Sequence, residues 1–156
     1  MAWGAATEAG REPAAPAATQ WRAFLRGLAI ELEAQAGPAA SAALLRGIGQ
    51  RMAQLLALPP VASMEALEME MNAILGETGW GSVRLALNEA ERCVILRHSG
   101  LPRIGSAGEP AGSWLAPVLE GLYQGWMGQQ PGADDKLRAT VQEPGDPTVL
   151  RYGRAA

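Results

Sequence analysis

The cysteine and histidine lie five residues apart, and together they are the pair best suited to nucleophilic chemistry. Cys93 could supply a thiolate and His98 a general base, but such a pair must meet in space and needs a third group to orient the base. Both residues lie in a stretch that alternates like a strand, where positions five apart point to opposite faces of the sheet. The spacing therefore argues against catalysis and favours a structural histidine at a strand end.

Carboxylates are the other groups with chemical potential, but no spacing brings a pair of them together. They lie on predicted helices and in one predicted loop: Glu31, Glu33, Glu65, Glu68, Glu77, Asp134 and Asp135. A solvated face explains them best. One cysteine and one histidine also exclude a thiolate zinc site and a multi-histidine metal site. We therefore expect no metal, no cofactor and no enzymatic activity.

A glycine-bearing loop before a helix, Gly105 to Gly108, invites a phosphate-binding interpretation. The sequence there, GSAG, matches neither GxxxxGK[ST] nor GxGxxG, and no lysine lies nearby. A tight structural loop is the favoured interpretation, and a backbone nest for an anion is the alternative.

The totals suit one ordinary globular domain. The chain has 156 residues, of which 48% are hydrophobic and 19% charged, and its net charge is −3. That charge gives no electrostatic case for nucleic acid or an anionic membrane. The first residues contain neither the basic and apolar regions of a signal peptide nor a membrane span, so we expect a cytoplasmic protein.

The chain divides into a flexible Ala/Pro-rich arm, residues 1–18, and a single domain, residues 19–156. Trp3 lies in the arm, either without a role or as a contact for a partner. A first helix is predicted over 19–35, with an apolar stripe and with Arg22 away from that stripe. The stripe consists of Trp21, Phe24, Leu25, Leu28 and Leu32.

Gly37-Pro38 separates that helix from a second one, predicted over 38–58. Besides an apolar face, the second helix has a stripe of small residues that includes Ala43 and Gly47, which suggests close helix packing. A third helix follows, with Ser63 as its N-cap.

Alternating residues then predict two hairpins, the first over 80–98 and the second over 137–152. One long helix lies between them. The predicted fold is α+β, with N-terminal helices and an antiparallel four-stranded sheet made of the two hairpins. No internal repeat is evident in the sequence.

The helix between the hairpins has two different stripes. Ser113 is its expected N-cap, and an apolar stripe follows at helical spacing: Leu115, Leu119, Leu122 and Trp126. A small stripe contains Pro117, Gly121 and Gly125. Because mid-helix glycines cost roughly 1 kcal/mol each relative to alanine, we expect another backbone to pack closely there.

Tryptophan supplies five of the eight aromatic residues. Trp21, Trp114 and Trp126 lie at stripe positions or at a helix start, which favours a core or interface role. The alternative is stacking against the apolar faces of sugar rings.

The segment GSAGEPAGSWLAPVLEGLYQGWM, residues 105–127, resembles the D-subunit family of bacterial cellulose synthase. Similarity extends through residues 21–58, the run NAILGETGWGSVRLAL from Asn72, and the strand leading into Leu101-Pro102. The tail before Thr19 departs from the family pattern, and the C-terminal hairpin matches it in kind only.

The resemblance implies a non-catalytic accessory subunit of the cellulose-secretion machinery. In one view of the family, dimers form a ring-shaped octamer whose passages guide β-1,4-glucan chains, with N-terminal segments at the passage walls. In another, a cytoplasmic scaffold near the inner membrane binds a proline-rich partner and aligns synthase complexes. The lack of a signal sequence favours the second view, and a periplasmic location is the alternative.

From the stripes and the resemblance together we predict two sets of site residues. The oligomer interface is predicted to contain Trp21, Phe24, Leu25, Leu28, Ala43, Gly47, Pro117, Gly121 and Gly125. Contacts with glucan or a protein partner are predicted at Trp3, Trp21 and Arg22.

A fainter resemblance, on a glycine-bearing helix followed by a hairpin containing VQEPGD, is to the vinyl-reductase-like small-molecule-binding domains. Those domains usually carry cysteines near this hairpin, and this chain has none after Cys93. The alternative function is therefore a ligand-binding domain with a pocket lined by Trp80 or Trp114.

Overall fold

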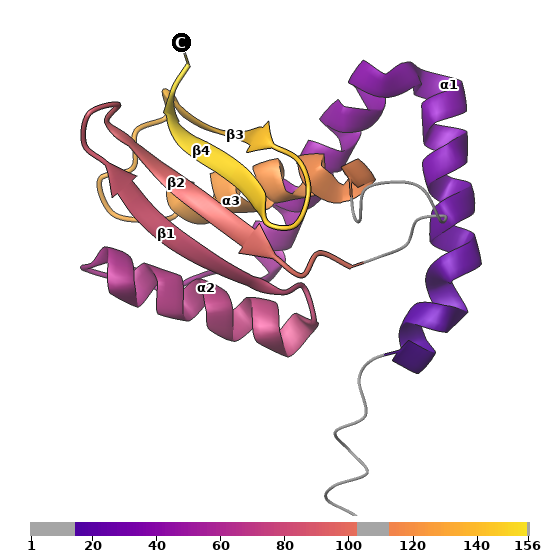
Figure 1. The fold of residues 1–156 in the computed structure, drawn as a ribbon, viewed down its shortest axis with the longest axis horizontal. Coiled ribbons are helices and arrows are strands. Elements are labelled where there is room, and N and C mark those ends of the chain that lie inside the picture. The colour runs from indigo at the N-terminus through magenta and orange to yellow at the C-terminus, as the bar shows by residue number, and fades with distance from the viewer. Residues whose placement is uncertain (1–14, 103–112, 156) are drawn as a thin grey trace, which may run out of the picture.

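The computed structural model describes residues 15–102 and 113–155, which form one four-stranded antiparallel sheet with helices packed on one face (Figure 1). The helices are α1 (Ala15–Leu55), α2 (Met64–Thr78) and α3 (Ala116–Gly128), and a 3₁₀ turn, η2 (Ser113–Leu115), precedes α3. The strands are β1 (Ser82–Asn88), β2 (Cys93–Ser99), β3 (Leu137–Glu143) and β4 (Thr148–Arg154). The α+β fold with two hairpins and a helix between them is confirmed.

Helix α1 covers both helices predicted before residue 58, with a sharp bend where Gly37-Pro38 was expected to separate them. Gly37 has φ 78° and ψ 168°, so the backbone there is not helical. The bend divides α1 into a first half, residues 15–36, and a second half, residues 38–55. The first half begins four residues before its predicted start and stands beside the rest of the molecule (Figure 1).

The sheet order β1-β2-β4-β3 places the two hairpins side by side as two α-β-β units: α2-β1-β2 and α3-β3-β4. The register between the inner strands has two-fold symmetry, because Leu96 and Leu150 face each other at its centre. The pairs on either side are Val94 with Tyr152 and His98 with Thr148. The structure therefore contains two similar α-β-β units, although no repeat is evident in the sequence.

Helix α2 closes the free edge of β1 with two side chains one turn apart. The Asn72 amide accepts from the Val83 N–H at 2.7 Å and donates to the Val83 carbonyl at 2.9 Å. The Glu68 carboxylate accepts from the Leu85 N–H at 2.8 Å. Glu68 is thus bound to the sheet edge, and its prediction as a freely solvated carboxylate is wrong.

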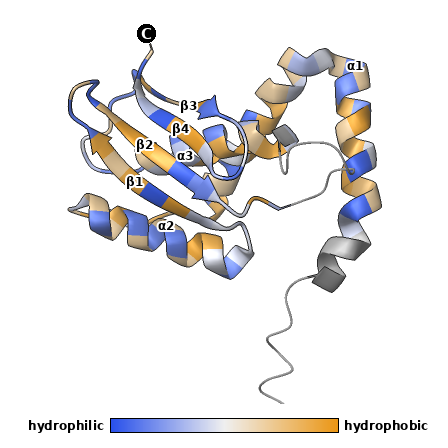
Figure 2. Cartoon of the chain, in the orientation of Figure 1, coloured by the Kyte–Doolittle hydropathy of each residue, from blue (hydrophilic) through white to orange (hydrophobic). Residues whose placement is uncertain are grey.

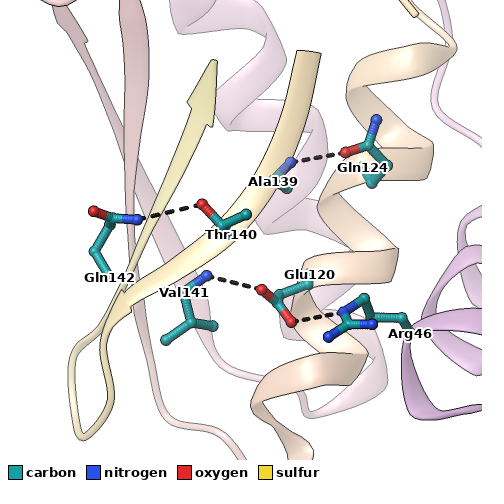
Figure 3. A network of polar contacts seen from close by, with 7 residues as sticks. All are labelled: Arg46, Glu120, Gln124, Ala139, Thr140, Val141 and Gln142. Atoms are coloured by element: carbon teal, nitrogen blue, oxygen red, sulfur yellow. Dashed lines mark hydrogen bonds and ion pairs between the residues drawn. The ribbon is translucent and has the colours of Figure 1, made fainter. Parts of the chain in front are cut away.

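Helix α3 closes the free edge of β3 in the same way (Figure 3). The Gln124 amide accepts from the Ala139 N–H at 2.7 Å and donates to the Leu137 carbonyl at 2.9 Å. The Glu120 carboxylate accepts from the Val141 N–H at 3.0 Å. Both edges are therefore occupied by a Glu and an amide four residues apart, which blocks strand addition there.

The core lies between the helices and the inner face of the sheet. Leu119, Leu122 and Trp126 of the predicted apolar stripe are at most 1% exposed, and the indole N–H of Trp126 donates to the Leu56 carbonyl at 2.9 Å. Tyr123 is also fully buried. This stripe therefore joins α3 to both the sheet and the end of α1.

The predicted N-cap of α3 is wrong. The chain first makes the 3₁₀ turn from Ser113, and α3 begins at Ala116 with Leu115 in the cap position and no side-chain cap bond. Pro117 lies in the first turn, where a missing N–H leaves no intrahelical bond unmade. The predicted Ser63 cap is confirmed, since its hydroxyl accepts from the Ala66 N–H at 3.1 Å.

Candidate interface on helix α1

The first half of α1 exposes a row of large apolar side chains. Trp21 is 56% exposed, Phe24 60% and Leu28 39%, and these three recur at three- and four-residue spacing on one helix face. The rings of Trp21 and Phe24 meet edge to face at 5.7 Å between centroids. Leu25 is half-buried beside them. Figure 2 shows that apolar residues continue along this half of α1, beyond the helix's contact with α3.

The direction of the first half is set at the bend. Gly37 has a positive φ that residues with a Cβ rarely adopt, and Pro38 can begin the second half because its missing N–H is unneeded there. The Ser41 hydroxyl then donates to the Leu32 carbonyl at 2.9 Å, which joins the two sides of the bend. The bend and this hydrogen bond set the direction of the exposed row relative to the second half of α1.

The second half of α1 packs on α3 with almost no space between the two backbones. A Cβ added to Gly121 would lie 1.9 Å from the Arg46 carbonyl oxygen, and one added to Gly49 would lie 2.0 Å from the Val118 carbonyl oxygen. A Cβ on Gly125 would lie 2.5 Å from the Ala53 Cβ. Small residues on both helices are therefore required.

This contact gives the small stripe of α3 a partner within the same chain. The close packing predicted for Gly121 and Gly125 is present, but it is made with α1 of one subunit and explained without a second. We therefore leave both glycines out of the interface proposed below. Sequence reasoning missed Gly49, although its spacing of four residues from Ala53 on the same helix is the pattern that could have identified it.

An ion pair fixes the two helices at one end of this contact (Figure 3). The Arg46 Nε donates to Glu120 Oε1 at 3.0 Å, and the Glu120 side chain is only 14% exposed. The other Glu120 oxygen accepts from the Val141 N–H. One carboxylate thus joins α1, α3 and β3, and the second half of α1 belongs to the body of the subunit.

The outer side of the second half is open and again apolar. A Cβ on Gly47 would meet nothing within 4 Å, and Ala43 is exposed beside it. Leu44 is 50% exposed and Ile48 41%. Of the predicted interface positions, Ala43 and Gly47 therefore lie on an accessible surface, while Pro117 is half-buried at the start of α3.

His98 has a structural role. Its ring is 1% exposed, with Nε2 2.7 Å from the Trp80 carbonyl and Nδ1 2.5 Å from the Tyr123 hydroxyl. Burial lowers the pKa of His98, against smaller opposing effects of the Trp80 carbonyl and Asp146, so the ring is neutral. It donates to Trp80 and accepts from Tyr123. The strand register places Cys93 on the opposite face of the sheet, as expected.

Two hollows in the described part of the chain bear on the alternative of a small-molecule site. One, of about 240 Å³, lies between the start of α2 and the sheet and is lined by Leu67, Leu85 and Met127 among others. The other, of about 460 Å³, lies near Asp134 and Tyr152. Neither is lined by Trp80 or Trp114, the residues expected to line such a pocket.

Two features that the sequence singled out lie outside the described residues. Trp3 and the loop Gly105–Gly108 are among the residues that the structure does not describe. Within residues 15–102 and 113–155, no three metal-ligating side chains cluster. In the same ranges, none of the helices combines the length and apolar character needed to span a bilayer.

Comparison with known proteins identifies the family of the chain. The family model for the D-subunit of cellulose synthase matches residues 10–153. A relative from Komagataeibacter xylinus, named "Cellulose synthase operon protein D", is 47% identical over 110 residues, which is 70% of each chain. A protein of the same name from Komagataeibacter sucrofermentans is 46% identical over the same share of both chains.

Proposed function

The chain belongs to the D-subunit family of cellulose synthase, and we propose that it is a non-catalytic, oligomeric accessory subunit of the bacterial machinery that makes and secretes cellulose. In this role it organises synthase complexes, or guides β-1,4-glucan chains, so that the glucans assemble into crystalline cellulose. A scaffold of this kind works through surfaces between subunits. The first half of α1 is the surface that best fits that task.

The observation that carries the proposal is the exposed row formed by Trp21, Phe24 and Leu28. Burying the exposed part of Trp21 alone would remove on the order of 100 Å² of apolar surface, or about 2.5 kcal/mol. Large apolar patches of this kind commonly mark protein–protein contacts. The bend at Gly37 holds the row clear of the subunit's own core, where another subunit can cover it.

We propose that a second copy covers this row and that the resulting dimers build a ring-shaped octamer. We propose that Leu25 on the first half of α1, Ala43 and Gly47 on the accessible side of its second half, and Pro117 at the start of α3 also belong to the interface. Because the dimer is the building unit of this ring, mass should rise in steps of two subunits, each of 16.4 kDa. Proposed partners beyond the ring are the synthase complex and a proline-rich scaffold protein.

Trp21 and Arg22 also suit contact with a glucan or with the proline-rich partner. Both are exposed on the first half of α1, and an indole face stacks well on a sugar ring or a proline. Trp3, in the arm before α1, is proposed to join them. We place the protein on the cytoplasmic side, near the inner membrane, with the periplasm as the alternative that cell fractionation would reveal.

The test compares two substitutions of equal exposure on opposite faces of one helix. Phe24 and Ile30 are both 60% exposed, but Ile30 lies away from the row. We expect Phe24→Asp to dissociate the oligomer, measured by light scattering after size exclusion, while Ile30→Asp leaves its mass unchanged. Circular dichroism should show that both variants remain folded.

Two results would contradict this proposal. A wild-type chain that stays monomeric at micromolar concentration has no oligomer to organise anything. Equal dissociation by Phe24→Asp and Ile30→Asp would show that charge on the helix matters and that the row does not.

A further inference from the structure

The outer face of the sheet, opposite the helices, carries an arginine on every strand. Strand alternation and register place four arginines on this face: Arg84, Arg97, Arg138 and Arg151. Arg84, Arg97 and Arg138 are exposed and Arg151 is half-buried. Figure 1 shows no helix in front of this face. We call these four residues the arginine face.

The arginine face holds more positive charge than the subunit neutralises. Arg84 and Arg97 stand directly opposite each other on β1 and β2, an arrangement that destabilises a sheet. Within the described residues neither has an ion-pair partner, and Arg151 pairs with Glu91 at 3.8 Å while its guanidinium also donates to the Arg154 carbonyl at 2.9 Å. The chain as a whole has net charge −3, so this face is a local reversal of its overall charge.

The two-fold arrangement of the sheet sharpens the pattern. Arg97 and Arg151 lie one residue beyond Leu96 and Leu150, so the two arginines are equivalent positions of the two α-β-β units. Ile95 is half-buried at the centre of the face, where it pairs with Ala86 of β1 and Arg151 of β4. Two such faces would repel each other, so two copies cannot pair through them, and the partner surface must be acidic.

Such a surface exists on α2 of the same protein. Glu65 and Glu77 are exposed, Met69 between them is 69% exposed, and the helix contains no lysine or arginine. Glu65 and Glu77 are roughly 18 Å apart along the helix axis. The arginine face crosses three strand spacings, roughly 14 Å. The acidic ends and the apolar middle of α2 thus match the size, charge and apolar centre of the arginine face.

We propose that the arginine face of one copy binds the outer face of α2 of another copy. This contact rests on the proposed scaffold function and deepens it, but it uses none of the α1 side chains in the exposed row. Because each copy has both surfaces, the contact is heterologous and can continue from one copy to the next. It joins assemblies that the α1 contact has already formed.

Charge exchange tests the contact in the full-length chain. One variant, Arg97→Glu with Arg151→Glu, makes the face acidic, and another, Glu65→Arg with Glu77→Arg, makes α2 basic. We expect each alone to weaken association at least about tenfold in sedimentation at about 50 mM NaCl, where screening is weak. An equimolar mixture of the two should restore it, because each acidic surface then meets a basic one.

The control pair is Arg26→Glu with Arg51→Glu, which makes the same charge change at exposed positions on α1, away from the arginine face, and should leave association unchanged. Raising the salt to about 500 mM should dissociate the wild-type contact, because the Debye length falls well below 10 Å.

Three results would overturn the inference. Association could be unaffected by the Arg97 and Arg151 changes, the mixture could remain as weak as its components, or those changes could abolish binding to phosphatidylglycerol vesicles alone. The last result would assign the face to a membrane. In each case the mass of Phe24→Asp still reports on the α1 contact, so failure here is distinguishable from failure of the proposed function.

Discussion

The two halves of α1 are both rich in apolar and small residues, yet one packs against α3 and the other is largely exposed. The second half lies against α3 so closely that Gly49 and Gly121 leave no room for a Cβ. The first half leaves Trp21 and Phe24 more than half exposed. A bend at Gly37 separates them. One helix therefore contains a segment that is packed within the subunit and a segment whose apolar row is exposed, where we propose that another chain binds.

Small residues and large ones indicate different partners in this helix. A glycine in a close helix contact indicates that the backbone of another helix lies next to it, and in this subunit α3 is that helix. Exposed aromatic residues need only apolar surface, which another subunit can supply. The glycine contact therefore stabilises the subunit, and the aromatic row is available for assembly.

The largest expected effect is on the second half of α1, from a matched pair of glycines. Gly49→Ala places a methyl group against the Val118 carbonyl and should cost about 3 kcal/mol of unfolding free energy. Gly47→Ala, two residues away and facing open space, should stabilise by roughly 0.5–1 kcal/mol. Denaturant unfolding in the Phe24→Asp background measures both without a contribution from association.

Opposite signs for these two alanines would support the division of α1. If both substitutions destabilise equally, backbone distance does not limit the contact with α3. The close packing described for the second half of α1 would then be contradicted.

A smaller expected effect is a pH dependence of the unfolding free energy, which arises in the body of the subunit and not in the first half of α1. Burial lowers the pKa of His98, so the unfolded chain binds its proton first as pH falls, and protonation favours unfolding. From about pH 7 to about pH 5, His98 should lower the unfolding free energy by at most about 1.4 kcal/mol per pH unit. Because His98 lies in the body, the direct contacts of the aromatic row should be unchanged.

Denaturation of wild type and His98→Gln across that range checks the effect. The variant should be less stable at neutral pH but should lose less stability on acidification. Parallel pH dependence in the two proteins would show that His98 is not the group that titrates.

Much of the fold could be predicted because it depends on local pattern. Alternation identified both hairpins, the leucine stripe identified the buried face of α3, and Gly37-Pro38 identified the bend. These features reside in a few neighbouring residues. The Ser113 cap failed because a 3₁₀ turn comes before α3, a choice that depends on how the helix docks.

The partner of the glycines could not be predicted, since spacing shows that something lies close but not which chain it belongs to. The two-fold repeat was also hidden. Glu68 and Glu120 are the same residue type at equivalent positions, but their neighbours Asn72 and Gln124 differ and share only the ability to accept from and donate to a strand edge. The role of Glu68 could not be predicted either, because it depends on α2 lying beside β1, where the carboxylate accepts from the Leu85 N–H.

Amide hydrogen exchange of the two halves of α1, in assembled wild type and in monomeric Phe24→Asp, shows whether another subunit covers the first half. We predict that amides around residues 45–53 are protected in both proteins. Amides around residues 21–32 should be protected in the wild-type assembly and should exchange much faster in the variant. Equal protection of residues 21–32 in both proteins would contradict an interface on the first half of α1.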